Sequence, residues 1–444
     1  MNKPIRFRRV CPLLVPGADG RGAFCSVPAD KVRPFWGRAF IFLMGGLAGG
    51  YLAGATVLFV GVRMTGVDSL AWHQVVWPGS WGEISHERSQ YFFKRAILAC
   101  ARQDYPLAYR SMATALEEDP HNYDVRLLMA QYAEFAGDFI TADQFFEQIL
   151  REFPKSGLRT AITWHDTLLS VGRPKALAAQ CLRMAVADKD RRFIWTGSLL
   201  LAMHLGHLGP DFVAKNEEAI GRLGPDIRSL VQAEALLVSG DVPAALAGLR
   251  HPFSQPVDGN LVIQQIQFFL RAGAPADAEV AWTVNAHGLD EFDRRLARCW
   301  IDRAMGYAPL GELEFSALAD RSHDEATLDK LVATLVMQPD QEWCRSLHRR
   351  VLKGPEPVTP AVASEMWLAA MVCGLPLERD FWTNYNAEKF HMTYPRIEAV
   401  DFGTLKGSQA GTVPFLVGMS PFGRNTIAAL YWRVKPPGGA VGGR

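Results

Sequence analysis

The sequence predicts an all-α fold: an α-solenoid, or superhelix of helical hairpins, preceded by one transmembrane helix and followed by a short irregular, β-leaning C-terminal tail. Three observations support this prediction: turns that recur at a nearly constant interval, an uncharged apolar stretch, and a change of pattern after Phe390. The expected boundaries are a basic, largely disordered leader (1–38), a transmembrane helix (39–62), a juxtamembrane segment (63–85), the solenoid (86–390) and the tail (391–444).

The leader and the span together predict a membrane orientation. Ala39–Val62 is 24 residues long and contains no charged residue, so it can cross a bilayer as a helix. It also exceeds the roughly 7–15 apolar residues in the core of a signal peptide. The leader holds eight basic and two acidic residues, a net charge of +6. Since basic flanks remain in the cytoplasm, we expect a single-pass protein of the bacterial inner membrane with its repeats in the periplasm.

Small residues within the span predict a helix-packing face. Glycines four residues apart lie on one side of a helix and allow a second transmembrane helix to approach its backbone closely. We therefore expect transmembrane helix–helix association here, although glycine is also common in membrane helices generally. The glycines in question are Gly46, Gly50 and Gly54.

The juxtamembrane segment is rich in tryptophan, with Trp72, Trp77 and Trp81 following shortly after the span. Indole rings favour the boundary between lipid headgroups and water, so these residues are expected at the membrane interface. The alternative is that they pack under the first helical hairpin.

The solenoid is predicted from turn-forming residues that separate apolar helical stretches. Successive turns are 34, 35, 34, 34, 33, 33, 33 and 35 residues apart. This period indicates about nine hairpins, each too small to bury its apolar face alone. Glycine suits the left-handed residue that ends a helix, and Asp or Pro suits the start of the next. The turn positions are Gln103, Gly137, Gly172, Gly206, Gly240, Gly273, Gly306, Pro339 and Gly374.

Two consecutive stretches of 34 residues share small and large apolar residues in register. Residues 89–122 carry Ala96, Ala108, Met112, Ala115 and Pro120. Residues 123–156 carry Ala130, Ala142, Phe146, Ile149 and Pro154. This pattern resembles the tetratricopeptide repeat (TPR) family. Small residues let two antiparallel helices approach closely, a large residue fills the gap to the next unit, and proline ends the second helix.

Later units keep the spacing between turns but not the residue types of the repeat pattern. The second half of the chain could therefore belong to another α-solenoid family. The small position of the second helix is occupied there by Leu177, Asp211, Ala245, Ala278, Gly311, Cys344 and Arg379.

The resemblance to TPR proteins implies a concave groove lined by the first helix of each hairpin. Carried over by position, it implies the groove residues Asp124, Leu127, Gln131, Glu134, Arg159, Ile162, Asp166, Leu169, Ile227, Leu230, Glu234, Leu237, Asn260, Ile263, Gln267 and Leu270. Four of these are carboxylates and only Arg159 opposes them, which favours an amphipathic, mildly basic peptide or helix as ligand. The alternative is that the carboxylates are solvated and the partner binds the convex face or the tail.

Motifs for chemistry are absent from the sequence. No Gly-rich loop has nucleotide-binding spacing, Ser420 lacks the flanks of a nucleophile elbow, and no C-x-x-C occurs among the seven cysteines. His204 and His207 straddle a helix end and are expected to pack or cap rather than bind metal. A net charge of +1 argues against nucleic acid as a partner. We therefore expect no enzymatic activity, no cofactor and no metal, with cysteines acting as small buried apolar residues.

The tail contains three short β-leaning or irregular pieces separated by Gly and Pro: Arg396–Phe402, Thr412–Val417 and Thr426–Val434. It is expected either to cap the apolar end of the solenoid or to bind a partner through its aromatic residues.

Repeat arrays generally hold other proteins. The sequence therefore predicts a membrane-anchored protein–protein interaction scaffold, a structural or assembly subunit of a membrane or envelope complex. Its expected partners are other membrane or periplasmic subunits, and the bilayer through residues 39–62. One alternative is a periplasmic chaperone or assembly factor that acts transiently on clients. Another is an organelle-membrane receptor with cytosolic repeats, which would suit unpaired cysteines better.

Overall fold

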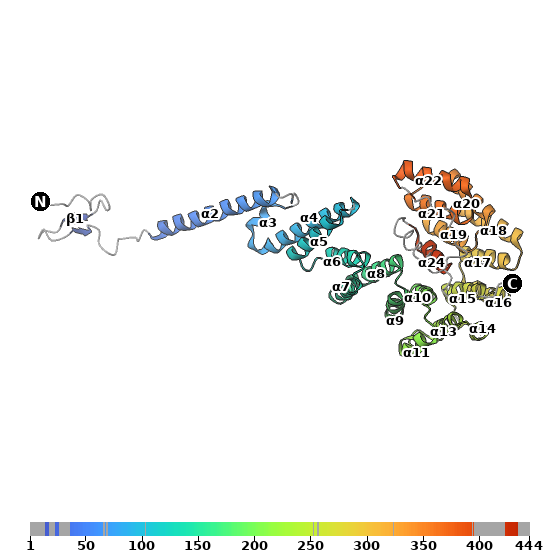
Figure 1. Ribbon diagram of the computed structural model, residues 1–444. Helices are drawn as coiled ribbons and strands as arrows, with labels where there is room; N and C mark the ends of the chain where they lie inside the picture. The colour runs from blue at the N-terminus through green and yellow to red at the C-terminus, as the bar shows by residue number, and fades with distance from the viewer. Residues whose placement is uncertain are drawn as a thin grey trace. The chain divides into compact units, whose positions relative to one another are not determined.

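In a computed structural model, the chain forms α-helices paired into hairpins (Figure 1). The described residues belong to two compact units, Met1–Arg126 and Leu127–Arg444, each with its own internal packing. The structure describes residues 14–16, 23–25, 36–64, 67, 70–102, 104–251, 253–254, 257–322, 324–392, 394 and 422–433.

The first unit contains the apolar helix α2 (Trp36–Met64). Its stretch Ala39–Met64 is the one helix of the described chain that is long and apolar enough to cross a membrane. At 1.5 Å per residue, its 29 residues extend about 43 Å, more than the roughly 30 Å of a bilayer core. The leader, expected to be largely disordered, contains two short antiparallel strands, β1 (Leu14–Pro16) and β2 (Ala23–Cys25).

The juxtamembrane segment folds back along α2. The short helices α3 (Trp72–Val76) and η2 (Pro78–Ser80) follow it, and the Tyr51 hydroxyl donates to the Val76 carbonyl over 2.6 Å. Ala55 of α2 belongs to a small buried apolar cluster with Val75.

The three juxtamembrane tryptophans lie at the surface of the first unit. Trp72, Trp77 and Trp81 are 44%, 68% and 53% exposed. They are therefore not buried under the first hairpin, and their place at a membrane interface stays a prediction. The glycine face of α2 is likewise open: a Cβ atom built on Gly46, Gly50 or Gly54 has no neighbour within 4 Å.

The first hairpin consists of α4 (Trp81–Ala101) and α5 (Tyr105–Glu118). Ala96, Ala108, Met112 and Ala115 are fully buried in it, as the repeat pattern predicts. In the next hairpin, Ala130, Ala142, Phe146 and Ile149 are equally buried. Small side chains at these positions allow the close approach of the paired helices.

The second unit is a helical repeat-like solenoid compatible with a TPR-type fold (Figure 1). Each hairpin pairs a first helix with the helix that follows it, and short 3₁₀ segments (η3, Pro154–Ser156; η4, Ala286–Gly288) join some hairpins. The pairs are α6 (Tyr123–Phe135, which begins in the first unit) with α7 (Phe139–Glu152), α8 (Gly157–Val171) with α9 (Pro174–Ala187), α10 (Arg192–Gly206) with α11 (Pro210–Lys215) and α12 (Glu217–Gly221), α13 (Pro225–Ser239) with α14 (Val242–Leu249), α15 (Gly259–Arg271) with α16 (Pro275–Asn285), α17 (Glu291–Ala304) with α18 (Ala308–Arg321), α19 (Glu325–Met337) with α20 (Gln341–Lys353), and α21 (Pro360–Val372) with α22 (Pro376–Phe390).

Left-handed residues end most first helices, as the turn pattern predicts. Six of the predicted turn glycines have positive φ: Gly137, Gly172, Gly240, Gly273, Gly306 and Gly374. At the fourth hairpin the prediction is one residue early, because α10 continues through Gly206 and His207 takes the left-handed conformation at φ 51°. Gln103 lies outside the described residues. At Pro339 the turn is made without a left-handed residue: Gln338, the C-cap of α19, has φ −131°, and the Asp340 carboxylate caps α20 by accepting from two backbone N–H groups.

Side-chain contacts join neighbouring hairpins. Trp300 donates its indole N–H to Thr334, 34 positions later, over 3.0 Å. Phe146 of α7 stacks on Trp164 of α8 with ring centroids 5.2 Å apart. The second contact confirms that the large residue of the repeat fills the gap to the next unit.

The cysteines of the repeats are packing residues. Cys181, Cys299, Cys344 and Cys373 are buried, Cys100 is half-buried, and none of these five forms a disulfide. Burial raises the pKa of the Cys299 thiol to about 12. Cys11 and the side chain of Cys25 lie outside the described residues.

The tail departs from the prediction. Most of the piece Thr426–Val434, expected to be β-leaning or irregular, belongs instead to the helix α24 (Arg424–Trp432). Thr426, Ala429 and Leu430 are buried on one side of this helix, so tertiary packing overrides the strand preference of its β-branched and aromatic residues. The other two β-leaning pieces, Arg396–Phe402 and Thr412–Val417, lie outside the described residues.

Candidate binding groove

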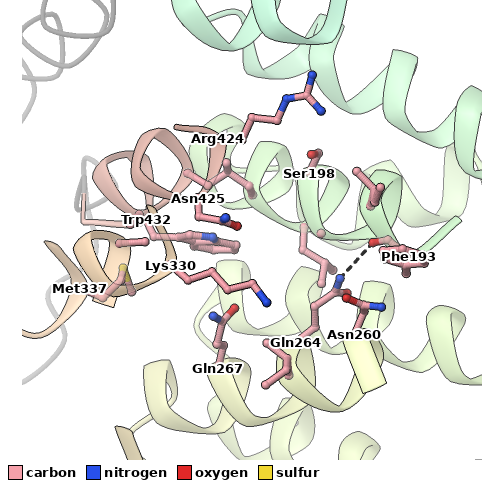
Figure 2. Close-up of a pocket in the computed structure, with 18 of the residues that line it drawn as sticks. Phe193, Ser198, Asn260, Gln264, Gln267, Lys330, Met337, Arg424, Asn425 and Trp432 are labelled. Atoms are coloured by element: carbon pink, nitrogen blue, oxygen red, sulfur yellow. Dashed lines mark hydrogen bonds between the residues drawn. The ribbon is translucent and has the colours of Figure 1, made fainter. Parts of the chain in front are cut away.

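Helix α24 lies against the first helices of several hairpins in the second unit (Figure 1). We call the surface of α8, α10, α15, α17, α19 and α21 that faces α24 the groove. A pocket of about 740 Å³ remains between α24 and the groove. Figure 2 shows Lys330 of α19, Gln267 of α15 and Asn425 of α24 reaching into this pocket. Its size is within the range of roughly 300–1,000 Å³ that is typical of ligand sites.

Most of the pocket wall is apolar. Its apolar lining includes Ile263 of α15, Leu296 and Trp300 of α17, and Met337 of α19. Helix α24 contributes the small side chains of Ala428 and Ala429, together with the large Trp432 ring. The lining of the pocket therefore combines large apolar side chains of the groove with both small and large side chains of α24.

Two groove helices from non-consecutive hairpins meet beside the pocket. Gln264 of α15 donates its amide N–H to the carbonyl of Phe193 on α10 over 3.0 Å, across 71 residues (Figure 2). A Cβ atom at Gly197 would lie 3.0 Å from the same amide nitrogen, so the missing side chain permits this approach. In the hairpin that begins with α10, the two short helices α11 and α12 replace a single long second helix.

The N-terminus of α24 is bound by two carboxylates of the groove. Asp329 accepts the backbone N–H groups of Asn425 (3.0 Å) and Thr426 (2.8 Å), and also the Asn425 side-chain amide (2.9 Å). Glu365 accepts the backbone N–H of Gly423 over 2.8 Å. These donors belong to the first turn, which has no intrahelical acceptors, so the groove supplies the acceptors that the helix itself lacks.

Side-chain contacts then hold the two ends of α24. Arg424 donates to Asp166 of α8 over 2.9 Å, and the buried Tyr431 hydroxyl donates to the Leu169 carbonyl over 2.6 Å. The Trp432 ring lies 3.7 Å from the Arg271 guanidinium and 4.9 Å from the His204 ring. A cation near the last turn of a helix is electrostatically favourable.

Glu365 has an unusual pKa because of its surroundings. Burial and the neighbouring negative charge of Asp329 raise the pKa of this carboxyl group to about 8, against an ordinary value of 4.5. The hydrogen bond from Gly423 acts in the opposite direction and is outweighed. Glu365 is therefore mainly protonated at neutral pH, which removes charge repulsion beneath the N-terminus of α24.

The expected acidic character of the groove is wrong for Glu134 and Glu234. Both side chains are completely buried, and each is paired with an arginine: Arg173 lies 2.8 Å from Glu134, and Arg271 lies 2.8 Å from Glu234. Asp166 is also paired, with Arg424. Arg159 is thus not the only opposing cation, because arginines at helix ends and in α24 neutralise the carboxylates. The predicted groove carboxylates therefore give no reason to expect a mildly basic ligand.

The remaining predicted groove residues divide into two groups. Ile162, Leu169, Asn260, Ile263, Gln267 and Leu270 line the pocket. Outside the pocket, Leu127 is buried and Gln131 half-buried in α6, and in α13 Ile227 and Leu230 are buried and Leu237 half-buried. Arg159 is exposed, and Asp124 belongs to the first unit. Transferring positions from the TPR pattern therefore locates the pocket wall on α8 and α15. The TPR pattern does not predict Lys330, Asp329 or Glu365, because these residues lie in hairpins that do not keep the residue types of the pattern.

The histidines have the structural roles expected. His207 ends α10 in the left-handed conformation, and His204 packs on Trp432. Within the described ranges, no group of three or more His, Cys, Asp and Glu side chains is placed to hold a metal ion. No protein-family model matches the chain, and no curated protein matches it either. The geometry of the groove itself must therefore carry any functional conclusion.

Proposed function

We propose that this protein is a membrane-anchored scaffold that binds a protein partner in its groove, as a structural or assembly subunit of a membrane or envelope complex. The observation that supports this proposal is the docking of α24: the groove holds a helix by directional hydrogen bonds at its N-terminus and by aromatic contacts at its C-terminus. A surface that holds one helix in this way has the chemistry to bind another.

The apolar helix α2 supports the membrane part of the proposal. In this arrangement, α2 anchors the chain in the inner membrane with the basic leader in the cytoplasm, and the solenoid meets its partner in the periplasm. The exposed tryptophans beside α2 then contact the lipid headgroups. The glycine face of α2 offers a contact for a partner's transmembrane helix.

Site-specific photocrosslinking in native membranes tests the proposal. A photoreactive residue replaces Gln267 in the pocket, and a matched control replaces Leu313, which is 72% exposed on α18. We expect one partner to crosslink at Gln267 and not at Leu313, and to co-purify at fixed stoichiometry in mild detergent. Many weakly bound proteins at Gln267 would instead identify a chaperone. Equal crosslinking at both positions would contradict a groove-binding scaffold.

A further inference from the structure

The pocket shows that α24 fills the groove incompletely. Protein interiors are close-packed, and the hairpin cores of this chain follow that rule. Beneath α24, however, about 740 Å³ remains open, and the residues of α24 that face it include Ala428 and Ala429. Other side chains that line the pocket are larger, among them Trp300 and Met337. A helix with a bulky apolar residue at the position of Ala428 would bury more surface in this groove.

The groove also restricts which residue can occupy the N-cap position of the docked helix. Gly423 precedes α24 as its N-cap and provides no side-chain cap. A Cβ atom at this position would overlap the carboxylate of Asp329, closer than real Cβ contacts allow. The capping acceptors come instead from Asp329 and Glu365 of the groove. The site therefore accepts a helix that begins with glycine and presents its first-turn N–H groups uncapped.

The length of α24 makes it a weak occupant. It has nine residues, and helices shorter than about 12 residues are rarely stable alone in water. Its helical structure therefore depends on docking. A helix that is already formed before it binds loses less conformational entropy on docking, so it can compete with α24.

We propose that the groove is a receptor for a glycine-capped amphipathic helix of a partner protein, and that α24 is an internal occupant which this helix displaces. The proposal rests on the scaffold function proposed above and specifies its ligand. The partner helix has glycine at the N-cap, a large apolar residue five positions later in place of Ala428, and an aromatic residue near its C-terminus in place of Trp432. Its N-terminus faces Asp329 and Glu365.

Peptide binding to the full chain in detergent tests this proposal. The probe is a fluorescent peptide of residues 422–433 that carries Ala428→Leu. The receptor is the full chain with Gly423→Ala, whose own α24 is expected to leave the groove. We expect this receptor to bind the probe about tenfold or more tightly than the unsubstituted chain does, because the internal occupant no longer competes. Circular dichroism of both receptors confirms that the repeats remain folded.

Two matched peptides control for non-specific binding. A probe that also carries Gly423→Ala should bind about tenfold or more weakly, because its methyl group overlaps the Asp329 carboxylate. A probe that keeps the native Ala428 should bind more weakly than the probe with Ala428→Leu. Equal affinity of all three peptides, or equal affinity of the two receptors for the probe, would overturn the proposal.

The failure of this inference can be distinguished from failure of the scaffold function. If the peptides do not discriminate but Gln267 still crosslinks to one stoichiometric partner, the scaffold stands and the helix-receptor proposal is wrong. If the peptides discriminate and no partner is captured, the receptor chemistry stands and the scaffold function is wrong.

Discussion

The backbone N–H of Thr426 donates to Oδ1 of Asp329 over 2.8 Å, although 97 residues separate them in the sequence. This bond places the first turn of α24 on α19, directly beside the buried Glu365 of α21. The N-terminus of α24, the Asp329 side chain and the largely protonated carboxyl group of Glu365 thus form one buried hydrogen-bonded cluster. Its stability depends on the proton held by Glu365.

Glu365 should make the stability of the second unit depend on pH. Its folded-state pKa of about 8 lies above the ordinary 4.5, so the folded protein binds more protons than the unfolded chain between these values. The free energy of unfolding contributed by this group is therefore fully present below about pH 4.5 and falls as pH rises to about 8. Urea unfolding at a series of pH values measures this slope. Glu365→Gln keeps the hydrogen bonds without the charge and should flatten it; an unchanged slope would contradict this role.

Gly423→Ala should release α24 from the groove without unfolding the hairpins. The added methyl group would overlap Asp329, and the two acceptors of the first turn would lose their donors. Hydrogen exchange of residues 424–432 should accelerate strongly, while the amides of α19 interior residues stay protected. Gly248→Ala is the matched control, because its Cβ meets nothing within 4 Å in α14. Slow exchange of residues 424–432 in Gly423→Ala would show that the helix tolerates a side chain there.

Arg173→Met should destabilise the second unit by about 3–5 kcal/mol, because it leaves the fully buried Glu134 without its cation. Arg173 also pairs with Asp143, so it links α6 and α7 to the following hairpin. Thermal and urea unfolding measure the loss, and adding Glu134→Gln should recover part of it. Arg222→Met is the control, because its partner Glu218 is exposed and such a pair contributes about 0–1 kcal/mol. Equal losses in both variants would contradict this assignment.

Ala142→Trp should disrupt the second hairpin. Ala142 is fully buried where α7 packs in the repeat, and overpacking of a filled core costs about 1–3 kcal/mol or more. Ile140→Trp on the same helix should have little effect, because Ile140 is 75% exposed. Limited proteolysis and thermal unfolding distinguish the two variants. Equal stability of both would mean that residue 142 does not lie at a close helix crossing.

Reporter fusions test the orientation of the chain. The positively charged leader is expected to keep the N-terminus in the cytoplasm, so residues after α2 are exported. A reporter that is active only in the periplasm, fused after Phe390, should be active, and a reporter that needs the cytoplasm should be inactive at the same site. The reverse pattern would place the solenoid in the cytoplasm.

The sequence by itself predicts the repeating elements of this protein because they depend on local chemistry. Glycine at Gly137 or Gly273 ends a helix through its own backbone freedom, and the buried Ala108 and Ala142 recur because each hairpin packs against its neighbour in the same way. The apolar span of α2 is equally local. The one shifted turn, at His207, arises where α10 gains a residue and the second helix breaks into two short pieces.

The tertiary structure alone decided what the groove contains. Residues 424–432 have β-branched and aromatic residues that favour a strand, and they become helical because Asp329 and Glu365 accept their first-turn N–H groups. Likewise, the repeat pattern places Glu234 in the groove as an acidic residue. In the structure its charge is paired with Arg271, which comes from another hairpin. Contacts between residues 96 to 262 positions apart have no period in the sequence, so the ligand chemistry of the groove emerges only when the hairpins are packed together.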